Sequence, residues 1–245
     1  MPTFRHGKNT AILYSQYNLS SFLNEMSSST EVETGETTAF GQNSKTYVVG
    51  LNDGTMSASG LFEATSTAGS EGVDPVISAS LGSDTDGVLT YAMSGLTVGQ
   101  PAKIAAVQST SYEVSSPVGD VVSISAEFQA NGGIQTGLIL ASGTVSTATT
   151  TNGTAQDNTA SSANGGVANF HVTANANGGS TTLKVQHSAD NSTWADLSGV
   201  TITAGANTRT SGRVAVSGTV NRYVRGVAVT ASTGAITYHI AFARN

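Results

Sequence analysis

The stretch GDVVSISAEFQANGGIQTGLILA, residues 119–141, carries the clearest β-strand pattern of this chain. Over residues 121–128 apolar side chains alternate with polar ones, so an extended strand has one apolar face and one face that carries serines and Glu127. A period of two with one polar face is typical of a half-buried antiparallel strand. Asn131-Gly132-Gly133 then supplies residues that tolerate positive φ, and residues 134–141 are again mostly apolar. The stretch therefore predicts a β-hairpin, with strands at 119–129 and 134–141.

Strands are predicted along most of the rest of the chain. Turn residues separate them at a spacing of about eight to twelve residues, which is typical of β-sandwiches and β-barrels. The expected fold class is therefore mainly all-β: a β-sandwich or β-barrel module with a short flanking helix, followed by a second β-sandwich. The further strands are expected at 46–50, 55–64, 88–96, 102–114, 167–175, 181–187, 199–204, 213–217, 221–230 and 234–242.

Helical signals are few. The apolar spacing from Leu19 to Met26 predicts a short helix over 17–26. A second short helix is predicted over Pro75–Leu81, because Asp74 is a good N-cap and proline suits the first helical position.

Two polar stretches divide the chain. Residues 27–45 predict an exposed loop or arm, and a loop of this length is usually functional or disordered. Residues 142–166 are low in complexity and predict a boundary or a flexible insertion. We therefore expect a first module over 1–145. Residues 146–245 are expected to form either a separate β-sandwich or the second half of a composite module.

The composition favours a protein with large contact surfaces. Charged residues make up 11% of the 245 residues, against roughly 25% in an average domain, and serine, threonine, asparagine, alanine and glycine take their place. Burying a hydroxyl against a partner costs less than burying an ion. The net charge of −6 is unevenly spread: residues 1–140 hold 13 acidic and 4 basic side chains, whereas residues 141–245 hold 3 and 6. The two parts are expected to face different surroundings.

Several classes of site are excluded or disfavoured by the residues. The chain has no cysteine, which removes disulfides and thiolate sites. The start has no apolar signal core, and no stretch reaches the ~18 apolar residues of a membrane helix, so we expect a soluble chain made in the cytoplasm with no membrane insertion. No nucleophile elbow and no phosphate-binding glycine loop is present. His171 and His239 fall inside predicted strands, where core or sheet-face roles are commoner than catalysis.

Metal and ligand sites are no better supported. Asp84-Thr85-Asp86 and Asp190-Asn191-Ser192 lack the oxygen ligands of a calcium loop, and Asx turns are the better interpretation. The single tryptophan, Trp194, is expected to begin a strand and pack on the core. Six basic residues spread over the second half are too sparse for a nucleic-acid site, and ion pairs between subunits are the more plausible use. We expect no enzyme activity and no cofactor.

Three long runs resemble the major tail tube proteins of long, non-contractile-tailed bacteriophages. They are PVGDVVSISAEFQANGGIQTGLIL (117–140), GGVANFHVTANANGGSTTLKVQHSADNSTWADL (165–197) and RVAVSGTVNRYVRGVAVTASTGAITYHIAFAR (213–244). The segment LNDGTMSASGLFEA (51–64) is similar to the early strand pair of the same family. Together these segments cover more than half of the chain, in the expected order.

The resemblance implies a structural virion protein without enzyme activity or cofactor. Subunits would form rings, most simply of six, whose strands close an inner barrel, and the rings would stack around a channel for genome ejection. The implied partners are further copies of the chain, other tail proteins such as the tape measure and the tail terminator, and phage DNA that passes through non-specifically. The chain would be made in the host cytoplasm and would end in the virion tail.

An acidic first half suits such a channel, because basic residues would hold phosphates. The carboxylates that we expect at the channel or at the ring-stacking face are Glu31, Glu33, Glu36, Asp84, Asp86 and Glu127. The polar arm at 27–45 would make ring-to-ring contacts.

Three other functions stay open on the residues alone. The chain could be another virion part, such as a head decoration protein or a component of the tail tip or fibre. It could be a carbohydrate-binding β-sandwich centred on Trp194. It could be a hydrolase, provided that a histidine, an acid and a nucleophile share one pocket.

Overall fold

The computed structural model describes residues 6–245, and it is mainly antiparallel β with one short α-helix, as the sequence predicts. The elements of the first half are η1 (Gly7–Asn9), β1 (Ala11–Tyr14), β2 (Tyr17–Asn18), β3 (Leu23–Glu36), β4 (Tyr47–Leu61), β5 (Ser66–Thr67), β6 (Ser70–Glu71), α1 (Val73–Ser80), β7 (Gly87–Ala92), β8 (Pro101–Ser115) and β9 (Ser123–Val145). Those of the second half are β10 (Thr149–Asn152), β11 (Gln156–Asp157), β12 (Gly166–Asn175), β13 (Thr181–Ser188), β14 (Ala195–Ala204), β15 (Thr210–Val216), β16 (Tyr223–Thr230) and β17 (Ile236–Arg244).

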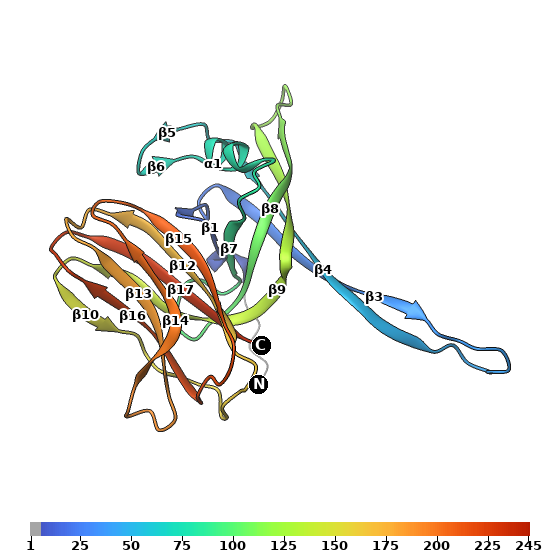
Figure 1. Cartoon of the computed structure of the whole chain (residues 1–245). Helices are drawn as coiled ribbons and strands as arrows, with labels where there is room; N and C mark the ends of the chain where they lie inside the picture. Colours follow the sequence, from blue (N-terminus) through green and yellow to red (C-terminus); the bar gives the residue numbers. More distant parts are fainter. Residues whose placement is uncertain (1–5) are drawn as a thin grey trace.

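Two sheets hold nearly all of these strands (Figure 1). The large sheet has the order β15-β12-β17-β9-β8-β7-β1-β2, and β4 and β3 extend it from another part of β9. The second sheet has the order β10-β16-β13-β14, with β11 also paired to β16. The division of the chain at residue 145 stays a prediction, and the large sheet takes strands from both sides of that residue.

Strand β9 joins the two ends of the molecule. Its residues 123–129 pair with β4, its residues 138–145 pair with β17, and β8 pairs along its other edge. The predicted hairpin over 119–141 is therefore wrong. Gly132 and Gly133 both have φ of +80°, but β8 pairs on both sides of them, with Asn131 and with Gln135. The glycines form a bulge in a continuous strand, because the long partner strand holds both flanks in one ladder.

The C-terminal core lies between the second sheet and the strands β15, β12, β17 and the end of β9. Phe170, Leu183 and Ile240 are fully buried at its centre. Apart from the ends, β12 and β17 are buried on both faces, because β7 and the β1–β2 turn cover the side that faces away from this core. Strands buried on both faces are nearly continuous apolar runs, and the polar exceptions need partners.

Two polar side chains of β12 find those partners across the seam to β7 and the β1–β2 turn. Asn169 Nδ2 donates to the carbonyl oxygen of Leu89 at 2.8 Å. His171 Nδ1 lies 2.7 Å from the carbonyl oxygen of Ser15, so Nδ1 carries the proton, and Nε2 accepts from the hydroxyl of Thr90 at 2.8 Å. His171 is completely buried, and burial lowers its pKa to about 3. The seam therefore depends on a neutral histidine.

The predicted helix over 17–26 is wrong. Leu19 is buried in a small core with Tyr14 and Phe128, and the chain is a strand from Leu23 onward, paired with β4. Ten residues of helical spacing do not outweigh such pairing, because tertiary contacts override weak propensities. The second predicted helix is confirmed as α1, which begins at Val73, two residues earlier than predicted, with Gly72 in place of Asp74 as the N-cap.

The predicted loop over 27–45 is a β-ribbon for most of its length. Residues 27–36 belong to β3, and β4 pairs with them as far as Tyr47 opposite Glu36. Figure 1 shows this ribbon, drawn in blue, extending away from both cores. The arm is thus present, but it is built from strands, because the threonines of β3 and the valines of β4 favour an extended conformation.

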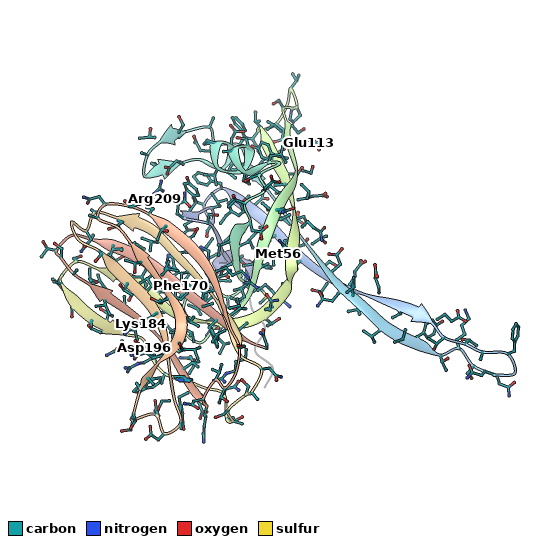
Figure 2. All side chains as sticks on the ribbon, in the orientation of Figure 1. Met56, Glu113, Phe170, Lys184, Asp196 and Arg209 are labelled. Atoms are coloured by element: carbon teal, nitrogen blue, oxygen red, sulfur yellow. The ribbon has the colours of Figure 1, made fainter. Side chains whose placement is uncertain are left out.

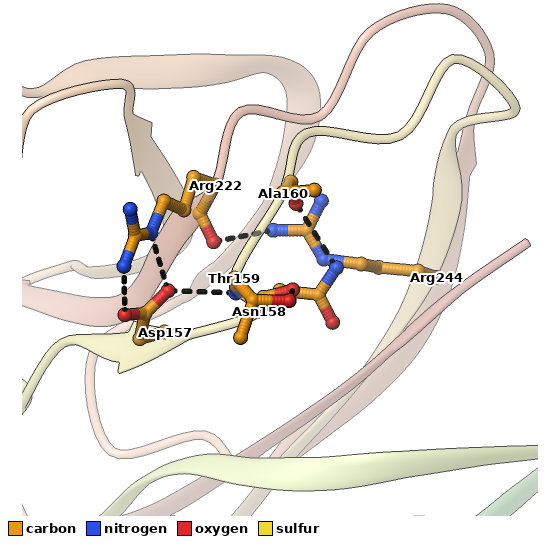
Figure 3. A network of polar contacts seen from close by, with 6 residues as sticks. All are labelled: Asp157, Asn158, Thr159, Ala160, Arg222 and Arg244. Carbon is orange, nitrogen blue, oxygen red and sulfur yellow. Dashed lines mark hydrogen bonds and ion pairs between the residues drawn. The ribbon is translucent and has the colours of Figure 1, made fainter.

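The low-complexity stretch 142–166 is also ordered. It supplies β10 and β11, which pair with β16. The Arg222 guanidinium donates to both oxygens of Asp157, at 2.7 and 2.6 Å, and this contact lowers the pKa of Asp157 to about 2 (Figure 3). Arg244 Nη1 donates to the hydroxyl of Ser162 at 3.2 Å and to the carbonyl oxygen of Val220 at 2.8 Å. These contacts hold the segment on the sheet edge, so its prediction as a flexible insertion is wrong.

We expect Gly137→Ala to destabilise the protein by about 1–3 kcal/mol, because overpacking a dense site forces backbone shifts. A Cβ on Gly137 of β9 would overlap the carbonyl oxygen of Phe242 on β17. Gly143→Ala is the matched control on the same strand, where a Cβ meets no atom within 4 Å. Urea denaturation of both variants measures the difference. Equal loss of stability in both would contradict the close approach of β9 and β17.

Candidate functional site

The candidate site is the solvent-exposed face of the four strands β3, β4, β9 and β8. These strands pair in that order, and their opposite face packs against the small core that includes α1. Every second residue therefore points away from the core. The register places the following residues on the outer face, hereafter the polar face: Glu25, Ser27, Ser29 and Glu31 of β3, Asp53, Thr55, Ser57 and Ser59 of β4, Ser123, Ser125, Glu127 and Gln129 of β9, and Gln108, Ser111, Glu113 and Ser115 of β8.

Side chains on the polar face bond to one another across the strands. Ser27 Oγ and Ser57 Oγ lie 2.8 Å apart, Ser59 Oγ donates to Glu25 Oε2 at 3.3 Å, and Gln129 Nε2 donates to Asp53. Figure 2 labels Glu113 on β8 and Met56 on β4, the latter belonging to the buried side of the same sheet. The surface is therefore a hydroxyl-rich layer with hydrogen bonds between neighbouring strands.

The charge on this face has one sign. Five of its members are carboxylates, at Glu25, Glu31, Asp53, Glu113 and Glu127, and none is lysine or arginine. Two of the six carboxylates expected from the sequence, Glu31 and Glu127, thus lie together here. Glu25, Asp53 and Glu113 were not among the expected residues. The alternation within β3, β4 and β8 is the signal that would have found them.

The other four expected carboxylates lie elsewhere. Glu33 is further out on the arm, at the register shift between Val32 and Thr34. Glu36 is exposed near the arm tip, where an ion pair with Lys45 at 2.9 Å lowers its pKa. Asp84 and Asp86 lie in the loop between α1 and β7, and Asn131 Nδ2 donates to Asp86 at 2.9 Å.

The four-stranded layer has two free edges. Among residues 6–245, β3 pairs with β4 alone, so its other edge is open from Leu23 to Glu36. β8 pairs with β7 only over Lys103–Val107, and Leu81 bridges to Ser109, so the edge from Thr110 to Ser115 is open in this part of the chain. Free edges invite pairing with another chain, and proteins usually cover them.

The outer surface of the second sheet carries a second polar cluster. Lys184 Nζ donates to Asp196 at 2.8 Å, Gln186 Nε2 donates to the same carboxylate at 2.7 Å, and Figure 2 labels this lysine and aspartate side by side. Trp194 directly precedes β14 and is half-buried, with the Arg225 guanidinium 4.2 Å from its ring centroid. The expectation that Trp194 packs on the core is wrong, because Arg225 covers it at the surface instead.

The observed ion pairs of the second half are made within the chain. Arg222 pairs with Asp157, Lys184 pairs with Asp196, and Arg209 pairs with Glu71 of the first half.

His239, like His171, is buried inside a strand. Asp190 accepts from the backbone N–H groups of Ser192 and Thr193, which is the predicted Asx turn.

Metal and membrane features were sought in the same residues. Within 6–245 no group of three or more histidine or acidic side chains converges to hold a metal ion. No helix in that range is long and apolar enough to cross a membrane.

Comparison with known proteins gives matches only among solved structures. No protein-family model and no curated protein matches the chain. The virion of a native gene transfer agent (GTA) particle matches with 13% identity and a TM-score of 0.44, over 54% of this chain and 98% of that one. The tail of an empty GTA particle, with C6 symmetry, matches with 12% identity and a TM-score of 0.42, over 54% and 97%. The SPP1 tail tube matches with 11% identity and a TM-score of 0.42, over 54% and 78%. The similar structures thus include a GTA virion, a GTA tail and the SPP1 tail tube.

Proposed function

We propose that this chain is a structural tail protein, the major tube subunit of a long-tailed phage-type particle. Copies join into rings, most simply of six, and the rings stack around a channel that conducts DNA. One observation carries this proposal: a four-stranded layer with two open edges presents a polar, acidic face that lacks lysine and arginine. The resemblance of residues 51–64, 117–140, 165–197 and 213–244 to tail tube proteins supports it.

The two open edges fit one another. β3 and β8 run in opposite directions, because three antiparallel pairings separate them. When copies related by a rotation meet edge to edge, β3 of one copy therefore lies antiparallel to β8 of the next. The alternation continues around the ring, and closure removes both exposed edges. Six copies give 24 strands, and at ~4.8 Å per strand the wall has a diameter of at least about 37 Å between backbones.

The polar face fits the inner wall of such a ring. Each bound phosphate would slow the passage of DNA, and an acidic, hydroxyl-rich wall offers no cation to bind one. In this arrangement Glu31 and Glu127 face the channel together with Glu25, Asp53 and Glu113. The C-terminal sandwich attaches through the second half of β9, on the side of the core, and so lies outside the wall.

Assembly of the purified chain tests the proposal. Negative-stain electron microscopy is expected to show rings or tubes with a central channel. Light scattering is expected to give masses that are whole-number multiples of the mass of one ring. Addition of a tape measure protein or a tail terminator is expected to set tube length. A particle that stays monomeric at every concentration, or that forms trimers only, would favour a fibre or decoration protein instead.

Proline on the open edge of β3 is expected to abolish ring formation. Successive N–H groups of a strand point to opposite sides, so one of Ser29 and Thr30 donates toward the open edge. At that position proline leaves the β3–β4 ladder intact, because edge strands tolerate proline on the solvent side. Ser29→Pro and Thr30→Pro are made separately, and the melting temperature of each variant shows which of the two N–H groups faces the open edge. The variant with unchanged stability is expected to remain monomeric in light scattering, and rings of normal size would refute pairing through β3.

A further inference from the structure

The outer face of the second sheet carries a row of polar side chains that crosses three strands. Gln186 on β13 is directly opposite Arg225 on β16 and directly opposite Asp196 on β14. Val185 and Val224, the neighbours of Gln186 and Arg225 along the chain, are buried in the sandwich core, so Gln186 and Arg225 point outward. The three polar side chains therefore lie at one level of the sheet and on one surface.

Hydrogen bonds connect this row. Arg225 Nε and Nη2 donate to Gln186 Oε1 at 2.9 and 2.7 Å, and Gln186 Nε2 donates to Asp196 Oδ1 at 2.7 Å. Lys184 Nζ donates to the other oxygen of Asp196 at 2.8 Å, and this contact lowers the pKa of the Asp196 carboxyl (Figure 2). Asp196 and Lys184 neutralise each other, whereas the charge of Arg225 has no counterion in the row.

Two aromatic rings extend the row. Trp194 precedes β14, and its ring reaches across β13 to Arg225, whose guanidinium carbon lies 4.2 Å from the ring centroid. Tyr223 is two residues before Arg225 on β16 and points to the same side, and the Arg222 guanidinium carbon lies 4.8 Å from its ring centroid. Trp194, Tyr223 and Arg225 are each half-buried. This surface, hereafter the platform, is formed by Lys184, Gln186, Trp194, Asp196, Tyr223 and Arg225.

Arg225 differs from the other basic residues of 141–245 in its free donors. Three of the others are paired with a carboxylate: Lys184, Arg209 and Arg222. Two more bond through both terminal nitrogens to neutral oxygens of the chain: Arg213 and Arg244. Arg225 contacts no carboxylate among residues 6–245, and its Nη1 has no hydrogen-bond partner there.

The orientation of the Arg225 guanidinium is fixed from two sides. Trp194 packs against its plane, and Gln186 occupies the edge formed by Nε and Nη2. The edge formed by Nη1 and the second N–H of Nη2 is left for a ligand. Two parallel N–H groups of this kind match the two oxygens of a carboxylate.

We propose that the platform binds an acidic polysaccharide. A uronate carboxylate accepts from the free edge of Arg225, the sugar ring packs against Trp194 and Tyr223, and the sugar hydroxyls bond to Gln186 and Asp196. The site is complete within one chain, so binding itself does not rest on the proposed function. In the proposed tube the platform repeats on every copy, and a polymer that carries many carboxylates can bind several copies at once.

Fluorescence tests the proposal directly, because Trp194 is the single tryptophan of the chain. The full chain is titrated with an oligomer of galacturonic acid, and the emission of Trp194 is expected to change and then saturate. The neutral oligomer of galactose with the same linkage is expected to bind at least about tenfold more weakly, because it lacks the carboxylate that Arg225 would bind.

Two variants separate the guanidinium from charge in general. Arg225→Lys keeps the positive charge but lacks the planar fork, and it is expected to weaken binding of the galacturonic acid oligomer by about tenfold. Its melting temperature is expected to stay close to that of the unchanged chain. Lys45→Gln removes one positive charge from the arm, where Lys45 pairs with Glu36, and this matched control is expected to bind as the unchanged chain does.

Three results would overturn the assignment. The first is an emission of Trp194 that neither oligomer changes. The second is equal binding of the acidic and the neutral oligomer, which would mean that no carboxylate is recognised. The third is binding of inorganic phosphate or of a short DNA duplex as tight as that of the acidic oligomer, which would mean a general anion site. Each would leave the proposed tail function standing, because the titration does not depend on assembly.

Discussion

Lowering the pH from 7 to 4 is expected to reduce the free energy of unfolding by about 3 kcal/mol through His171 alone. The unfolded chain binds a proton at this side chain near pH 6.5, whereas burial lowers the pKa of His171 to about 3 in the folded state. Stability from the neutral ring is therefore fully present above pH 6.5 and is lost as the pH falls toward 3. His239, the cross-strand neighbour of His171, acts in the same direction, since burial lowers its pKa to about 4.

Urea denaturation at several pH values between 7 and 4 measures this effect. His171→Gln is expected to be less stable than the unchanged chain at pH 7, because the bonds to Ser15 and Thr90 are disturbed. As the pH falls from 7 to 4, the free energy of unfolding of His171→Gln is expected to decrease less than that of the unchanged chain, because the variant has lost one titrating group. His6→Gln, at an exposed histidine, is the control and is expected to keep the full pH dependence. An unchanged slope in His171→Gln would contradict the role of the seam.

Lysines on the polar face are expected to make assembled tubes bind duplex DNA at least roughly tenfold more tightly, with a steep dependence on salt. Ser57→Lys and Glu127→Lys change neighbours on β4 and β9, and a ring repeats the change in every copy. A closed set of cations around the channel would then neutralise several phosphates at once. The unchanged tube is expected to show little binding.

Binding is measured with tubes and short duplexes labelled with a fluorophore, at two salt concentrations. Thr203→Lys places the same charge on the outer surface of the second sheet and serves as the control. It is expected to raise DNA binding much less than the two channel variants. Equal binding by all three variants would mean that the polar face does not line the channel.

Alternation along single strands made much of the fold predictable from sequence. The strands of the second half, from Gly166 to Arg244, match the expected ranges within a few residues at each end. The polar face was predictable for the same reason, since Glu127 alternates with apolar residues and lies among serines on one side of β9. The glycine pair at 132–133 led to the wrong prediction of a hairpin, because residues that favour a turn also permit a bulge. Only pairing with the partner strand β8 decides between the two.

The features of the fold that the sequence did not predict depend on contacts between distant parts of the chain. The strand character of residues 23–26 comes from pairing with β4, and the order in 142–166 comes from β16 and from Asp157 with Arg222. The partners of His171 lie 81 and 156 residues away along the chain. No local pattern reveals such partners.

The continuity of β9 limits how such a chain can diversify. One uninterrupted strand supplies both a position on the polar face, at Glu127, and a core position of the sandwich, at Leu140. A sandwich appended through a flexible linker can be exchanged or deleted as a unit, but here a cut after Val145 would strip the partner strand from Ile139 and Leu140 and uncover the seam beneath β12. Sequence change is therefore expected mainly in the loops between β13 and β14 and between β16 and β17, and the sandwich is expected to be inherited together with the four-stranded layer.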